Sequence, residues 1–246
     1  SMFEECYIKE VNLGKIHTGE LTAVKSMFKG ANYIEKITLP QVFNTSKATD
    51  FSYMFAELRD LTEINNIDKL DTTSALDMNH MFTYFGVPID TITPLLKATH
   101  VTDLSYMFYD ARIRNTVTFS PLFDTSHVTT MESMFEGSSA YPVDLSSFSL
   151  ASAVNMSKMF KSIDTNEEGK ECVNGGGGPS EVIWPSTTQY TPALTTLKSL
   201  FHGNCYITKI KAPKITAPNL KDTSFAFSGL GEITEIDLDG FDTSAV

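Results

Sequence analysis

The sequence predicts an α/β solenoid, a chain wound into about nine similar coils around one continuous core. A Met-Phe motif returns about every 26 residues along the 246-residue chain, and a short alternating apolar segment follows most copies. A unit of this length cannot bury its own apolar face, whereas stacked units cover one another. We therefore interpret residues 1–246 as a single repeat domain with one inserted loop.

The first half of each repeat is built on a phenylalanine. The aligned positions are Phe3, Phe28, Phe55, Phe82, Phe108, Phe135, Phe160, Phe201 and Phe227. In the copy around Phe135, the apolar residues Val128, Met131, Met134 and Phe135 are spaced i, i+3, i+6 and i+7. This spacing predicts a helical or 3-10 turn with its apolar side inward. We expect the phenylalanine column to fill the interior.

The second half of each repeat predicts a short strand. Its pattern is apolar-x-x-apolar-x-apolar, as in Ile34, Ile37 and Leu39, and alternation with β-branched residues is typical of strands. Stacked coils would join these strands into a parallel sheet with a spacing of about 4.8 Å. The stretch 87–94 fits only with a shift of one residue. Trp184 aligns with Leu39 and is expected to face inward.

One repeat is longer than the others, with 41 residues between Phe160 and Phe201. The extra length predicts an inserted loop at 164–181, which contains four successive glycines at 175–178. We expect this loop to be mobile, dispensable for folding and available as an extra contact for a partner. The glycine run lacks the Gly-Lys-Ser/Thr ending of a phosphate-binding loop, so no nucleotide cofactor is expected.

Asp124, Ser126 and His127 have the residue types of a catalytic triad within four positions. The Asp-Thr-Ser part returns at 71–73, as Asp-Thr-Thr, and at 242–244, whereas histidine is absent from most copies. Short oxygen-bearing side chains suit a turn or a helix start because they accept hydrogen bonds from free backbone N–H groups. We interpret Asp-Thr-Ser as a repeated turn and cap. No catalytic residues are expected, and the protein is interpreted as a non-enzyme.

Composition argues against several further classes of function. The net charge of −11 disfavours binding to nucleic acid, and no apolar run approaches the roughly 20 residues of a membrane span. The histidines are scattered, and the cysteines Cys6, Cys172 and Cys205 form neither a zinc spacing nor an expected disulfide framework. No metal site and no cofactor are therefore expected.

The stretch FDTSHVTTMESMFEGSSAYPVDLSSF, residues 123–148, resembles the repeat of the BspA-like leucine-rich-repeat proteins, in the branch with a 26-residue bacterial surface-protein repeat. The resemblance covers nearly the whole chain except the inserted loop and the weakened last two Met-Phe copies. It implies a leucine-rich-repeat-like fold and a cell-surface or secreted location. It also implies an adhesin that binds a protein or glycan on another cell or surface, without catalytic residues or cofactor.

Exposed positions of the predicted strands are the candidate partner-binding residues, because solenoids use such extended faces for binding. They are Glu35, Lys36, Thr38, Glu63, Asn65, Thr116, Thr118, Thr208, Lys209, Lys211, Thr234, Glu235 and Asp237. A merely solvated sheet face explains the same pattern equally well.

Two functions remain open from the sequence. The first is a surface or secreted binding module, an adhesin segment. The alternative is a structural spacer or building block of a surface layer, appendage or virion, in which self-association is possible. The chain opens within a repeat at Ser1 and closes at Val246 where the next motif is due, so we expect further repeats, or an anchoring or assembly domain, beyond both ends.

Overall fold

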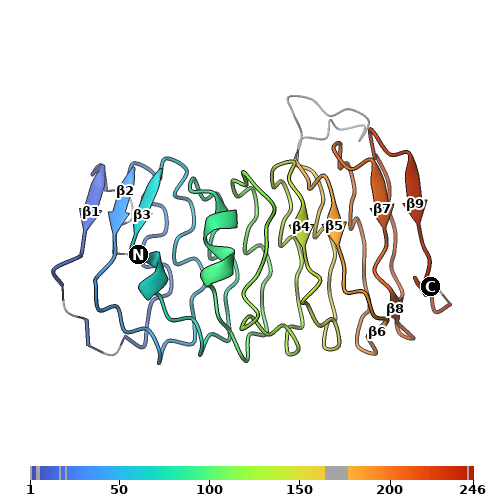
Figure 1. The fold of residues 1–246 in the computed structure, drawn as a ribbon, viewed down its shortest axis with the longest axis horizontal. Coiled ribbons are helices and arrows are strands. Elements are labelled where there is room, and N and C mark those ends of the chain that lie inside the picture. Colours follow the sequence, from blue (N-terminus) through green and yellow to red (C-terminus); the bar gives the residue numbers. More distant parts are fainter. Residues whose placement is uncertain (1, 4–5, 17, 20, 164–176, 243) are drawn as a thin grey trace.

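The computed structural model of the chain describes residues 2–3, 6–16, 18–19, 21–163, 177–242 and 244–246. It is a solenoid of parallel strands with about eight turns and very little helix. Figure 1 shows the coils stacked side by side from the N-terminal to the C-terminal end. The solenoid prediction is confirmed in this coarse form, with slightly fewer turns than the nine coils expected.

Short strands stack in register along one side of the solenoid (Figure 1). The first parallel sheet contains β1 (Glu10–Asn12), β2 (Lys36–Thr38) and β3 (Glu63–Asn65). Farther along the same side, β4 (Val143–Asp144) pairs with β5 (Val182–Ile183), and β7 (Lys209–Lys211) pairs with β9 (Glu235–Asp237). On another side, β6 (Gln189–Tyr190) pairs with β8 (Ile215–Thr216). Equivalent residues of neighbouring repeats therefore lie beside one another.

Helix among the described residues is limited to three 3-10 turns outside the Met-Phe motif. They are η1 (Ile67–Lys69), η2 (Ile89–Thr91) and η3 (Thr93–Leu95). The last two occupy the stretch whose alternation is shifted by one residue, and they interrupt the row of strands after β3. Ile89 and Ile92 are still buried, so this coil keeps its apolar contribution to the core without forming a strand.

The helical turn expected at the Met-Phe motif is a series of tight turns instead. Residues directly before the Met-Phe pair have positive φ, 58° at Tyr53, 57° at Tyr106 and 55° at Ser133. A left-handed residue ends any right-handed helical run. The backbone groups of these turns form hydrogen bonds between coils. For example, the Phe108 N–H donates to the Met134 carbonyl at 2.9 Å. The i, i+3 spacing correctly predicts that these apolar side chains face inward. The helical turn that it also predicts is wrong.

The phenylalanine column forms the centre of the core. Ring centroids of successive members lie 5.3 to 6.0 Å apart, from Phe3 to Phe227. The column is buried from Phe28 to Phe201, and its two end members are partly buried. Phe160 stacks on Phe201 at 5.3 Å although 41 residues separate them. The extra length of this repeat therefore does not interrupt the phenylalanine column.

Two further expectations concern the long repeat. Trp184 is only 8% exposed and packs edge to face on Phe160, which confirms its inward orientation. The insertion at 164–181 lies mostly outside the described residues, and so do Cys172 and the glycines at 175 and 176. Cys205 is disulfide-bonded. The sequence predicts no disulfide framework, because the spacing of the three cysteines matches no recognised pattern.

Threonines of the Asp-Thr-Ser turns connect neighbouring coils through buried hydroxyl groups. The Thr125 hydroxyl donates to the Ser149 carbonyl at 3.1 Å and accepts from the Ser149 N–H at 2.8 Å. Thr72 makes the same pair of hydrogen bonds with Lys97. Because a buried backbone group without a partner is costly, the repeated threonine serves the stacking of coils as well as the turn.

Candidate functional site

The predicted partner-binding residues lie where the sequence analysis expected them, on the strand side of the solenoid. All of them are exposed or partly exposed. Thr116 and Thr118 flank Val117, which forms an isolated bridge with Val143 rather than part of a strand.

Charges on this sheet face are largely paired with one another. Lys36 lies 3.0 Å from Glu63, and Lys209 lies 2.9 Å from Glu235, each across adjacent coils. Parallel in-register stacking brings these opposite charges together. Exposed pairs of this kind contribute little to stability, but they leave fewer free charges for a partner. The row of strands is also interrupted at η2 and η3.

Asp124, Ser126 and His127 have the geometry of a turn. The Ser126 backbone N–H donates to the Asp124 carboxylate at 2.8 Å, and this bond holds the pKa of Asp124 below its usual range. The Ser126 hydroxyl lies 3.1 Å from His127 Nδ1. In a catalytic triad the carboxylate orients the imidazole instead. The arrangement agrees with the turn interpretation.

A stacked aromatic column lies on the surface beside the Met-Phe turns. Tyr53, His80 and Tyr106 occupy the same motif position in three successive coils. The His80 ring lies between the two tyrosines, 4.5 Å from Tyr53 and 4.6 Å from Tyr106, with interplanar angles of 9° and 4°. All three side chains are partly exposed, so the core does not account for their size.

This column forms one wall of a surface hollow of about 390 Å³, which we call the tyrosine groove. Its lining residues are Tyr53, Glu57, His80, Thr83, Tyr84, Tyr106, Tyr109, Glu136 and Lys158. Tyr84 and Tyr109 meet edge to face at 5.4 Å, and Tyr109 is tilted against Tyr106 at 5.8 Å. Volumes of 300–1,000 Å³ with aromatic walls and a few polar groups are typical of ligand sites.

Ion pairs surround the tyrosine groove at both ends. Glu57 lies 3.9 Å from Lys29 at one end. At the other end Glu136 lies 3.0 Å from Lys161 and is only 5% exposed. Its second oxygen accepts a hydrogen bond from the Ser133 hydroxyl at 2.6 Å. The carboxylates are thus held in place and balanced by lysines.

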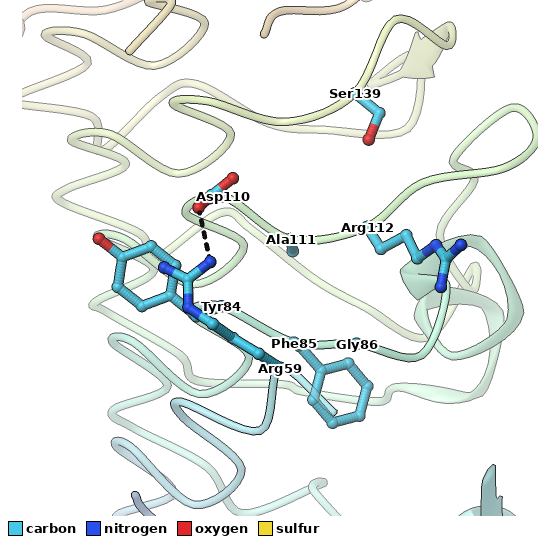
Figure 2. Close-up of a pocket in the computed structure, with 8 residues that line it drawn as sticks. All are labelled: Arg59, Tyr84, Phe85, Gly86, Asp110, Ala111, Arg112 and Ser139. Carbon is cyan, nitrogen blue, oxygen red and sulfur yellow. Dashed lines mark hydrogen bonds and ion pairs between the residues drawn. The ribbon is translucent and has the colours of Figure 1, made fainter. Parts of the chain in front are cut away.

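A second hollow of about 230 Å³ adjoins the groove and shares Tyr84 with it (Figure 2). The Arg59 guanidinium lies 3.8 Å over the Tyr84 ring, and Arg59 Nη1 donates to Asp110 Oδ2 at 3.3 Å. Figure 2 shows Arg112 on the opposite side of this hollow from the Arg59–Asp110 pair. These contacts hold the Tyr84 ring as a wall between the two hollows.

Burial shifts the titration of two groove residues. It lowers the pKa of His80, so the neutral imidazole is favoured at neutral pH, and it raises the pKa of Tyr109. No group of three or more histidine, cysteine, aspartate or glutamate side chains within the described residues could hold a metal ion. The groove therefore offers neutral rings, hydroxyl groups and paired charges.

Sequence reasoning missed this groove, although the sequence carried a signal for it. At the position before Met-Phe, most repeats have serine or lysine, such as Ser26, Ser133 and Lys158. Four repeats have an aromatic residue there, and three of these, with Tyr53, His80 and Tyr106, are adjacent. A local departure from the repeat at an outward position marks a feature that the fold itself does not require.

Comparison with known proteins found one family. A family model described as Mycoplasma protein of unknown function, DUF285, matches residues 1–116 and 93–170. No curated protein and no solved structure matched the sequence. In the part of the chain that the structure describes, no helix has the length and apolar character to cross a membrane.

Proposed function

The chain belongs to the Mycoplasma protein family of unknown function DUF285, and from that premise we propose that it is a non-enzymatic binding module. Its ligand is a protein or glycan on a cell or another surface. A cell-surface or secreted location is part of the proposal, as is a relationship between its coils and the BspA-like leucine-rich repeats. Both rest on the resemblance of the repeat motif.

The tyrosine groove is the observation that carries this proposal. Tyrosine supplies a large, rigid contact area with a polar end, which makes it common at the energetic centre of interfaces. In this chain five aromatic rings gather on neighbouring coils, and three of them replace the serine or lysine of other repeats. The strand face remains a second candidate contact, but its charges are largely paired across coils.

The variant Tyr53→Ser/Tyr106→Ser tests this function. Serine is native at this motif position in other repeats, with a similar φ of 54° at Ser26 and 55° at Ser133, so we expect the fold to be kept. Binding to cultured host cells and to arrays of extracellular proteins and glycans should fall by at least about fivefold, since each of the two lost ring contacts is worth roughly 0.5–1.5 kcal/mol.

Tyr190→Ser is the matched control, because Tyr190 is 63% exposed and lies outside the groove. It should bind like the wild type. A wild-type protein that binds neither cells nor arrays, but assembles with itself, would refute the proposal and favour the structural building block.

A further inference from the structure

We infer that the tyrosine groove binds an uncharged glycan, and that one sugar ring stacks where the aromatic column stops at Ser133. This inference rests on the proposed function and narrows its ligand to one chemical class. Three features of the groove support it: the end of the aromatic column, the pairing of the nearby charges and the hydrogen-bonding groups that line the groove.

The aromatic column ends abruptly. His80 covers one face of the Tyr106 ring at 4.6 Å. In the next coil the same motif position is Ser133, which carries no ring. Its hydroxyl is buried under the Glu136 carboxylate, to which it donates at 2.6 Å. Lys158 follows one coil farther and lines the groove together with Tyr106. A ring entering from solvent would continue the column over the Glu136 carboxylate that covers Ser133, between Tyr106 and Lys158.

A sugar ring suits this position chemically. The face of a tyrosine ring is the negative side of its quadrupole, and the C–H groups of a pyranose carry a small positive charge. Sugar hydroxyl groups extend around the rim of the ring, where the groove presents polar side chains. Glu57, Glu136 and Lys158 lie at the ends of the groove, within the same hollow as the tyrosines.

The charge of the groove argues against an ionic ligand. Each carboxylate that lines the groove has a lysine partner, at 3.9 Å for Glu57 and 3.0 Å for Glu136, and Lys158 lies 3.7 Å from Glu132. Tyr53 already has Lys29 over its ring at 4.6 Å. A cationic or anionic ligand would have to displace one of these partners, whereas hydroxyl groups can share them.

His80 adds a defined acceptor. The Thr83 hydroxyl donates its only proton to the Tyr106 carbonyl at 2.7 Å. His80 Nδ1, 3.2 Å from the same hydroxyl oxygen, must therefore be the donor. Nε2 of the neutral ring is then an acceptor, which can accept a hydrogen bond from a sugar hydroxyl.

Ser133→Tyr tests the inference by extending the column into the proposed position of the sugar, and it also removes the hydrogen bond from Ser133 to Glu136. Tyrosine is native at this position in two repeats with nearly the same φ, 58° and 57° against 55° at Ser133. The wild type is tested on an array of neutral and acidic glycans, and the best neutral oligosaccharide is then titrated. We expect Ser133→Tyr to lose binding by at least about tenfold.

Tyr106→Ser should weaken binding in the same titration by about two- to tenfold without filling the groove, since one ring contact is lost, and Tyr190→Ser should leave it unchanged. Circular dichroism melting curves verify that each variant is folded. If Ser133→Tyr proves unfolded, the Tyr106→Ser titration tests the inference instead, and unchanged affinity of that variant would overturn it. Wild-type-like affinity in folded Ser133→Tyr, or an array that retains only acidic glycans or none, would overturn the inference.

Enzymatic deglycosylation of the host cells separates this inference from the proposed function. We expect the treatment to abolish wild-type binding. Undiminished binding to the treated cells would refute the glycan ligand while leaving a protein-binding function intact. Absence of binding to treated cells, untreated cells and protein arrays alike would refute the function itself.

Discussion

Phe135→Ala is expected to lower the free energy of unfolding by about 3–5 kcal/mol, the usual range for a buried phenylalanine. The Phe135 side chain is fully buried and stacks between Phe108 at 5.3 Å and Phe160 at 5.8 Å. Its removal leaves a cavity between two coils that the flanking rings cannot fill without shifting the stack. Equilibrium unfolding in urea measures the loss.

Phe225→Ala provides the control for that measurement. Phe225 belongs to the same repeat motif but is 61% exposed, so its removal should change stability by no more than about 0.5 kcal/mol. A loss below about 1 kcal/mol for Phe135→Ala, or equal losses for the two variants, would place the phenylalanine column outside the core and refute the architecture.

Gly86→Ala should destabilise the protein by about 1–3 kcal/mol, because it forces atoms into an already filled space. A Cβ at Gly86 would lie 2.4 Å from the carbonyl oxygens of both Arg59 and Leu61. Both are backbone atoms of the neighbouring coil, so no rotation of a side chain relieves the clash. The melting temperature should fall accordingly, and circular dichroism would record it.

Gly19→Ala is the matched glycine control, since a Cβ there meets no atom within 4 Å. It should be neutral or slightly stabilising, because alanine restricts the unfolded chain. A Gly86→Ala variant as stable as Gly19→Ala would show that the coils near Gly86 are not packed as closely as described.

The repeat itself could be predicted because each coil imposes the same requirement on the same position. An inward residue must match its neighbours above and below, so Phe108 and Phe135 recur and Trp184 was placed inward correctly. The turns at the Met-Phe motif were misread as helical, because their i, i+3 spacing resembles a helix. The positive φ at this position could not be predicted from residue type, because tyrosine, serine and lysine all adopt it, as at Tyr53, Ser133 and Lys158.

The candidate site was harder to predict than the fold. Strand-face residues such as Lys209 and Glu235 could be placed on one side from alternation alone, but their ion pair depends on the register between coils. The tyrosine groove combines Tyr84 and Tyr109, which occupy different motif positions, with the column at Tyr106. Only the stacking of coils brings these side chains together.

We expect the ligand to bind at the tyrosine groove rather than on the strand face. Amide chemical shifts of the ¹⁵N-labelled protein, recorded during titration with the strongest neutral glycan from the array, test it most directly. The largest shifts should occur at His80, Tyr106 and Glu136, and the strand residues Lys209 and Lys211 should be unchanged. Shifts confined to the strand residues would contradict it.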